Sequence, residues 1–240
     1  MSLYGGLNTV YRALPEPARR WVNERAPLPV RRLRRRVVSR LEHTANPDEL
    51  YNRHYYEQVV DPIMVRSADA MAASIQRELR PESLIDVGCG TGALMLALER
   101  LGVRCIGFDQ ASAALEHCRA RGLSVRRLDI VHDPLPDEHA DVAVSTEVAE
   151  HLPQSASERF VELLTSVAPV VVMSAALPGT GGKDHVNEQP TEYWVAKFAA
   201  RRFAHDAALG ARMREEWREA GVDPIYFKSL MIFRAADPPR

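Results

Sequence analysis

The sequence predicts an α/β fold in which a mostly parallel sheet is covered by helices on both faces. Between residues 80 and 175, short apolar runs of strand length alternate with longer amphipathic runs of helix length. This alternation is typical of successive βαβ units, whose strands pair in parallel. A glycine-rich loop follows the first of these strands. The apolar fraction of 46% in 240 residues is enough for a sizeable buried core.

The elements can be assigned in order along the chain. Residues 47–80 predict two helices, the aromatic-rich "PDELYNRHYYEQ" and the amphipathic "MVRSADAMAASIQREL", which Pro81 ends. The alternating strands and helices follow as "SLIDVG", "GALMLALERLG", "VRCIGFD", "SAALEHCRARG", "SVRRLD", "ADVAVST", "SASERFVELLTSV" and "PVVVMSAA". Gly102 and Gly122 are placed to cap two of the helices. The tail predicts two more helices, "YWVAKFAARRF" and "ARMREEWREAG", before strand material in "PIYFKSLMIFRA".

The first 46 residues differ in charge from the rest and predict a basic arm ahead of a main domain of residues 47–240. Residues 1–40 hold ten arginines and two glutamates, whereas the remaining 200 residues carry 21 basic and 30 acidic side chains. The tract "RRLRRRVVSR" favours a solvated helix packed on the body, and contact with a polyanion or a membrane surface is the alternative. The acidic body argues against nucleic acid as the main partner.

Cysteine use and hydropathy predict a cytoplasmic protein. Cys89, Cys105 and Cys118 form no CxxC pair, which argues against a disulfide framework or a structural zinc site. No apolar run approaches the roughly 18 residues that a membrane span needs. The N-terminal stretch has no continuous apolar region followed by a cleavage site, so we expect no signal peptide.

The segment "LIDVGCGTGALMLAL" carries the strongest functional signal. A strand ends at Asp86, and Gly88, Gly90 and Gly92 follow before a helix begins, so the backbone can turn tightly and approach a ligand. Asp109, at the end of the next strand, is placed to bind the two hydroxyls of a ribose. A nicotinamide site prefers G-x-G-x-x-G, whereas the third glycine here comes one residue early. The Asp86 carboxylate suits a ligand with an amino group rather than a pyrophosphate.

With these motifs the chain resembles the class I S-adenosylmethionine-dependent methyltransferases. "DVGCGTG", "GFD", "RRLDI" and "STEVAEHLP" carry the resemblance, strongly over residues 80–175 and weakly elsewhere. It implies a Rossmann-like class I methyltransferase fold, with a mostly parallel seven-stranded sheet flanked by helices and an N-terminal helical extension whose residues 47–80 form a lid. Tyr55 and Tyr56 in that extension either cover the cofactor or pack the helix.

The resemblance also implies roles for individual residues around S-adenosylmethionine. The methionine end would be held by Asp86, Gly88, Gly90 and Gly92, the ribose and adenine edge by Asp109 and Gln110, and the adenine amino group by Asp129 with Ile130. For Asp129, a strand-end carboxylate that serves as a cap is the alternative.

The stretch "EVAEHL" follows the fourth strand, whose end faces the cofactor in an open α/β sheet. Glu147, Glu150 and His151 stand at positions i, i+3 and i+4, which would place them on one face of a helical turn. After the fifth strand, "LPGTGGKDHVNEQPTEYW" carries His185 on a glycine-rich loop at the same edge of the sheet. Two carboxylates and two imidazoles form a ligand set that admits magnesium, manganese or zinc.

This set resembles the metal motif of the small-RNA 3′-terminal 2′-O-methyltransferases and the E-x-x-E-H motif of ubiquinone-pathway O-methyltransferases. The string "DHVNEQPTEYW" is similar to that of bacterial methyltransferases from glycan and natural-product clusters. A metal-free role of His151 or His185 as a general base, and a purely structural role for all four residues, are the alternatives. Glu188 and Asn187 are reserve ligands or substrate contacts.

Together these patterns predict an S-adenosylmethionine-dependent O-methyltransferase. A hydroxyl acceptor needs a base or a metal ion to remove its proton, so a His/Glu cluster near the methyl group favours oxygen. We expect the acceptor to be a sugar or a glycosylated small molecule, with Glu147, His151 and His185 as the catalytic residues. The alternatives are a 2′-O-methyltransferase of RNA 3′ ends and a cofactor-binding module without catalysis.

Overall fold

The structure is a computed structural model that describes residues 47–236, so the predicted basic arm of residues 1–46 lies outside the described residues. The helical elements are α4 (Pro47–Leu50), α5 (Arg53–Tyr55), η2 (Tyr56–Val60), α6 (Asp61–Leu79), α7 (Ala93–Arg100), α8 (Ser112–Ala120), η3 (Ala149–His151), η4 (Gln154–Ala156), α9 (Ser157–Val167), α10 (Thr191–Ala200), α11 (Ala207–Glu219) and α12 (Pro224–Phe227). The strands are β1 (Ser83–Val87), β2 (Arg104–Asp109), β3 (Val125–Arg127), β4 (Val142–Thr146), β5 (Val170–Ser174), β6 (Phe203–His205) and β7 (Met231–Ala235).

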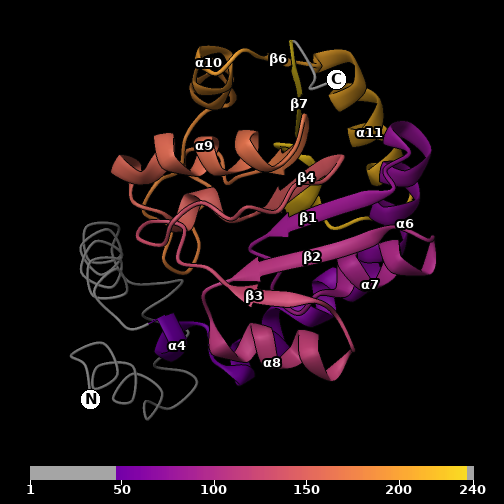
Figure 1. Ribbon diagram of the computed structural model, residues 1–240, viewed down its shortest axis with the longest axis vertical. Helices are drawn as coiled ribbons and strands as arrows, with labels where there is room; N and C mark the ends of the chain where they lie inside the picture. The colour runs from indigo at the N-terminus through magenta and orange to yellow at the C-terminus, as the bar shows by residue number, and fades with distance from the viewer. Residues whose placement is uncertain (1–46, 237–240) are drawn as a thin grey trace, which may run out of the picture.

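The described strands form a single seven-stranded sheet in the order β3-β2-β1-β4-β5-β7-β6 (Figure 1). The first five are parallel, and β7 runs antiparallel to β5 and β6. The strand order turns back at β1, with β2 on one side and β4 on the other, which is where open α/β sheets bind ligands. The predicted fold, a mostly parallel seven-stranded sheet flanked by helices, is therefore confirmed.

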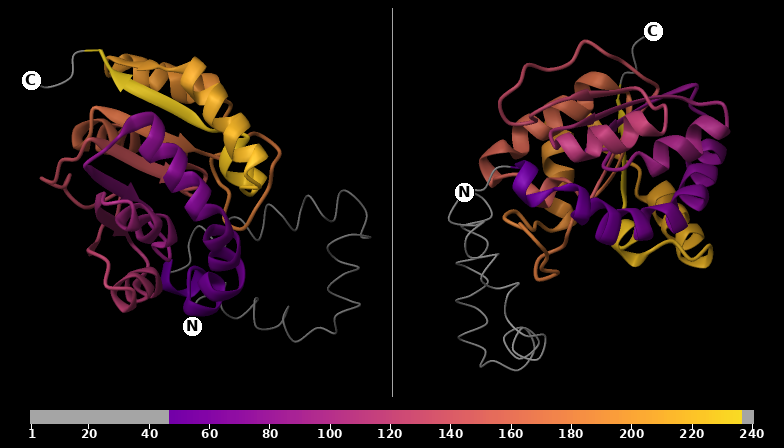
Figure 2. Two further views of the ribbon diagram at one scale, coloured as in Figure 1. Left: turned by 90° about the vertical axis from the view of Figure 1, so that its right-hand side faces the viewer. Right: turned by 90° about the horizontal axis from the view of Figure 1, so that it is seen from below.

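Helices cover both faces of the sheet, and each face has its own apolar core (Figures 1 and 2). Helices α6, α7 and α11 pack on one face through Met71, Met95 and Trp217, and α9 and α10 pack on the other through Phe160 and Phe198. Successive side chains of a buried strand point to opposite faces, so one strand supplies both cores. This burial on both faces explains the continuous apolar strand runs in the sequence.

Three segments differ from their predicted form. In the tail, Pro224–Phe227 at the start of the expected strand material forms the short helix α12, where Asp223 caps the first turn. The run "YWVAKFAARRF" was expected to be helical throughout, but α10 ends at Ala200 and the segment Phe203–His205 pairs with β7 as strand β6. Arg202, with φ of +62°, makes the turn between them, and pairing at the sheet edge overrides local helix propensity. The first predicted helix is also interrupted, because Asn52 accepts a hydrogen bond from the Tyr55 amide and begins a new helical turn.

The loop between β1 and α7 is tightly folded against its neighbours. Gly88, Gly90 and Gly92 have φ values of +79°, +53° and +74°, which side chains rarely adopt. The amides of Gly88 and Cys89 both donate to the carbonyl of Phe108 at the end of β2, at 2.7 and 3.1 Å. These bonds hold the loop beside the end of β2, where Asp109 follows.

Gly92 has a packing role in this loop. A Cβ atom at this position would lie 2.4 Å from Leu123 Cδ1 and 2.8 Å from Cys118 Sγ. We therefore expect Gly92→Ala to lower the free energy of unfolding by about 1–2 kcal/mol for the left-handed backbone and by a further ~1–3 kcal/mol for the overlap. Gly102→Ala is the matched control, since Gly102 has φ of +87° and nothing within 4 Å of the added atom. Equal losses for the two variants in urea denaturation would contradict the packing role.

Candidate active site

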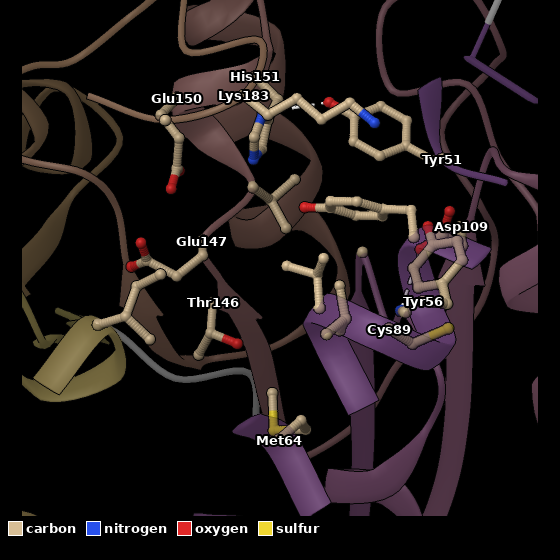
Figure 3. Close-up of a pocket in the computed structure, with 18 of the residues that line it drawn as sticks. Tyr51, Tyr56, Met64, Cys89, Asp109, Thr146, Glu147, Glu150, His151 and Lys183 are labelled. Carbon is tan, nitrogen blue, oxygen red and sulfur yellow. Dashed lines mark hydrogen bonds between the residues drawn. The ribbon is translucent and has the colours of Figure 1, made fainter. Parts of the chain in front are cut away.

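A cavity of about 350 Å³ opens at the carboxyl ends of β1, β2 and β4, within the size range of small-molecule sites. It is lined by the loops after these strands, by residues 51–64 of the N-terminal segment, by residues 180–185 of the loop after β5, and by α12 (Figure 3). Segments far apart in the sequence thus meet at the edge of the sheet that the sequence indicated.

One end of the cavity holds most of the residues expected around the cofactor. Its lining includes Asp86, Gly88, Gly90, Asp109, Gln110 and Ile130. Asp109 also fixes the glycine loop, because its carboxylate accepts hydrogen bonds from the amides of Gly90 at 3.0 Å and Ala111 at 2.9 Å. Tyr56 lies beside the same loop, and a Cβ atom at Gly90 would lie 3.7 Å from its ring.

Two residues expected in this site lie outside the cavity lining. Gly92 packs under the loop, as described above. The Asp129 carboxylate accepts hydrogen bonds from the amides of Val131 at 2.9 Å and His132 at 3.2 Å, and it contacts the His132 ring at 3.0 Å. Asp129 therefore caps the turn after β3, which is the alternative that the sequence left open, while its neighbour Ile130 lines the cavity.

The carboxyl groups of Glu147 and Glu150 lie together at the other end of the cavity (Figure 3). The expectation that they share one helical turn with His151 is wrong, because Glu147 has φ of +55° and precedes the short turn Ala149–His151. The Ser174 hydroxyl donates to Glu147 at 2.7 Å. Glu150 is fully buried, and neither of its carboxyl oxygens has a hydrogen-bond partner of standard geometry among the described residues, although the amides of Glu150 and Ala176 lie near enough to oppose the rise in its pKa. Burial, reinforced by the charge of Glu147, raises the pKa of Glu150 well above its usual value.

The His151 ring presents one nitrogen to the cavity. Its Nδ1 atom lies 3.3 Å from the carbonyl oxygen of Asp184 and 3.1 Å from the hydroxyl oxygen of Tyr51. A carbonyl oxygen can only accept, so this contact places the proton on Nδ1 and leaves a lone pair on Nε2. Burial, together with the nearby His185, lowers the pKa of His151 to about 4, so the ring is neutral near pH 7.

The loop after β5 brings His185 to the same place. The amides of Val186 and Asn187 both donate to the carbonyl oxygen of Glu150, at 2.8 and 3.1 Å. This tether sets the His185 ring 5.0 Å from that of His151, measured between ring centroids. One ligand atom each from Glu150, His151 and His185 lies within 4.8 Å of the others. Glu147 is outside this group and lies against Glu150, so three of the four expected ligands are gathered.

Several residues around the cavity were not singled out by the sequence. The Tyr51 hydroxyl donates to the Asp184 carboxylate at 3.0 Å, and the Lys183 ammonium donates to the Leu50 carbonyl and lies 4.3 Å from the centroid of the Tyr55 ring. The N-terminal segment and the loop of residues 177–190 therefore meet over the cavity, at one end of the molecule (Figure 2). The aromatic run in "PDELYNRHYYEQ" was the available signal for this cover.

Residues 85–170 match the model of a family described as a methyltransferase domain. Over these residues, about a third of the chain, the sequence is similar to a methyltransferase domain. Two relatives are ubiquinone biosynthesis O-methyltransferases: that of Methylococcus capsulatus is 39% identical over 80 residues, and that of Nitrosococcus oceani is 31% identical over 132 residues. These matches cover 30% and 51% of this chain, and 34% and 51% of the relatives. The chain thus spans about half or less of the length of these curated relatives.

Solved structures share the fold of this chain at low sequence identity. The DhpI–SAH complex has a TM-score of 0.56 at 16% identity, and covers 86% of this chain and 98% of its own. The sugar N-methyltransferase KedS8 from Streptoalloteichus has a TM-score of 0.56 at 14% identity, with 76% and 92% covered. Within residues 47–236, no helix has the length and apolar character needed to cross a membrane.

The environment of Asp86 and Asp109 disfavours the charged form of both carboxyl groups. Burial raises the pKa of Asp86 to about 7, and the charge of Asp109 adds to this shift. Burial also raises the pKa of Asp109 to about 6, although the amides of Ala111 and Gly90 oppose the shift. A ligand with an ammonium group and hydroxyl donors would stabilise both carboxylates in their charged form.

The raised pKa of Asp86 predicts a loss of stability with rising pH. Asp86 has a pKa of about 7 in the folded protein against 3.8 for the free side chain. Between these values the folded state keeps a proton that the unfolded state has released, so the free energy of unfolding falls as the pH rises through this window. Asp86→Asn removes the Asp86 contribution, so it should reduce this dependence and stabilise the ligand-free protein at pH 8 by about 1–4 kcal/mol. Urea unfolding at pH 5 and pH 8 measures it, and the same pH dependence in both proteins would contradict it.

Proposed function

We propose that this protein transfers the methyl group of S-adenosylmethionine to a hydroxyl oxygen of a small molecule. The observation that carries the proposal is the cluster of Glu150, His151 and His185 in the same cavity as the glycine loop. An amine acceptor needs little help to react, whereas a hydroxyl must lose its proton, and this cluster supplies groups for that task. The relatives named as O-methyltransferases support the same acceptor atom.

The aspartate end of the cavity fits the cofactor. Bound there, S-adenosylmethionine supplies a methyl group already activated by a sulfonium. Asp86 is placed to bind its amino group, Asp109 to bind its ribose hydroxyls, and the open backbone at Gly88 and Gly90 to allow close approach. Tyr56, which is 5% exposed, closes this end against water.

The Glu/His end of the cavity fits a divalent cation. Glu150 is buried beside a second carboxyl group and has no hydrogen-bond partner of standard geometry among the described residues, so a proton or a cation would compensate its charge. We propose that Glu150, His151 and His185 hold the ion and that Glu147 is a further carboxylate beside them. An ion bound there would lower the pKa of the acceptor hydroxyl. Nitrogen and carboxylate ligands admit magnesium, manganese or zinc.

The wall between the two ends favours an acceptor with an apolar part. Val60, Ile63 and Met64 line it from one side, and Ile225 and Tyr226 from the other. Val59 and Ile225 are 46% and 39% exposed at the same wall. A glycosylated small molecule with an apolar aglycone, or a phenol, satisfies both the polar cluster and this wall. A bare sugar leaves the wall unused. Among the described residues that line the cavity, Lys183 is the one Lys or Arg side chain, which gives the RNA-end alternative little support.

The cofactor assignment predicts different effects for two aspartates at the ends of neighbouring strands. Asp109→Ala should weaken S-adenosylhomocysteine binding by roughly 1–3 kcal/mol, because it removes charge-assisted hydrogen bonds to the ribose and releases the Gly90 amide. Asp129→Ala is the matched control and should keep its affinity, since its carboxylate faces the turn after β3. Calorimetric titration of both variants measures these affinities. Unchanged affinity in folded Asp109→Ala would remove Asp109 from the site.

The ion site predicts binding and activity that depend on Glu150. The purified protein should bind about one Mn²⁺ per chain by electron paramagnetic resonance, and Glu150→Gln, which removes the buried charge, should weaken this binding at least 10-fold. Formation of S-adenosylhomocysteine with a panel of phenols and phenolic glycosides should stop after chelation and return with a single metal. Binding of S-adenosylhomocysteine should persist throughout. Full activity of the chelated enzyme would exclude the ion and leave His151 or His185 as a plain general base.

A further inference from the structure

The Glu188 carboxylate accepts three hydrogen bonds from donors in its own loop. Its carboxylate lies 3.0 Å from Nδ1 of His185, and it accepts from the amides of Gly179 at 2.7 Å and Gly181 at 2.5 Å. The side chains of His185 and Glu188 are 11% and 18% exposed, so water competes little for these contacts. The sequence left open that Glu188 is a reserve metal ligand. Because its carboxylate already accepts from three donors, it is not free for that role.

The loop that carries His185 needs such a restraint. Gly179 and Gly181 have φ values of +88° and +66°, and glycine-rich backbone is costly to hold in one conformation. The Glu188 carboxylate binds the first half of the loop to its last residues. The Gly182 backbone packs against the same imidazole, since a Cβ atom at this position would lie 2.2 Å from Nε2 and 2.5 Å from Cε1 of His185. The Gly182 backbone and the Glu188 carboxylate therefore both restrain the ring.

We propose that Glu188 is the positioning residue of His185. A carboxylate can only accept, so its contact holds the proton on Nδ1 and leaves a lone pair on Nε2 of the imidazole that is grouped with Glu150 and His151. Glu188 acts through the imidazole and touches neither substrate nor ion. The consequence for metal affinity rests on the proposed divalent-ion site, whereas the tautomer of His185 does not.

The two imidazoles of the cluster are held in the same way by different acceptors. The Asp184 carbonyl and the Tyr51 hydroxyl lie at Nδ1 of His151, and the Glu188 carboxylate lies at Nδ1 of His185. Outer carboxylates that orient a histidine ligand contribute 10- to 100-fold to metal affinity in other proteins. We expect an effect of this size here, because without Glu188 the His185 ring can rotate and exchange tautomers.

The experiment compares Glu188→Ala and Glu188→Gln with Glu192→Gln, which changes an exposed carboxylate in the first turn of α10. Nitrogen chemical shifts of the histidine rings in the metal-free protein report the tautomer of His185. We expect the Nδ1–H form in the wild type and Glu192→Gln, and a mixture of both forms in Glu188→Ala. Mn²⁺ affinity should fall about 10- to 100-fold in Glu188→Ala and less in Glu188→Gln, whose amide oxygen can still accept. Affinity for S-adenosylhomocysteine should stay within about twofold, since Glu188 is absent from the cofactor end.

The outcomes separate this inference from the proposed function. An unchanged tautomer and unchanged Mn²⁺ affinity in folded Glu188→Ala would overturn the positioning role. A wild-type protein that binds no Mn²⁺, but whose His185 tautomer changes in Glu188→Ala, would remove the ion and keep the positioning role. An equal loss of S-adenosylhomocysteine affinity would show that Glu188 supports the fold and would also overturn the inference. If Glu188→Ala does not fold by circular dichroism, the tautomer and Mn²⁺ affinity of Glu188→Leu, which keeps more of the side-chain volume without an acceptor, decide in its place.

Discussion

Four carboxyl groups buried at one edge of the sheet are the constraint on which the rest of this site depends. Asp86 and Asp109 stand at one end of the cavity, and Glu147 and Glu150 at the other, and burial raises the pKa of each of them. Burying negative charge is costly unless hydrogen bonds or cations compensate it. Backbone amides at Gly90 and Ala111 partly compensate Asp109, and the Ser174 hydroxyl donates to Glu147. A retained proton or a positively charged ligand, such as a sulfonium with an ammonium group or the proposed divalent ion, would compensate the rest.

The cavity is built from a rigid part and a covering part. The rigid part is the set of strand ends, which the apolar cores on both faces of the sheet hold in place. The cover consists of the N-terminal segment and the loop of residues 177–190, which meet through the contacts of Tyr51 with Asp184 and of Lys183 with Leu50. Because the cover also supplies His185 and the hydroxyl beside His151, the same segments both cover the cavity and arrange the imidazoles.

The arrangement of the two imidazoles explains why the same residues can serve a metal ion or a base. In each ring the Nδ1 proton is engaged by an oxygen of the protein, so Nε2 presents a lone pair. That lone pair can bind a cation or receive a hydroxyl proton. We propose the first of these uses, because a cation would compensate the charge of the buried Glu150. The solved structures at 14–16% identity share the fold of this chain and say nothing about this chemistry.

The sequence by itself determined the fold and the edge of the sheet that carries the site. Strand and helix periodicity assigns residues to elements, and in a parallel sheet the residues after β1, β2 and β4 come together. The sequence therefore placed Asp86, Asp109 and Glu147 at one edge, and the resemblance to methyltransferases indicated their roles. Tertiary structure decided the direction of each side chain. It turned Asp129 into a cap, set Glu147 off the turn of Glu150, and made the Phe203–His205 segment a strand. These outcomes depend on contacts between segments far apart in the chain, such as the tether of the His185 loop to the Glu150 carbonyl, which no local pattern contains.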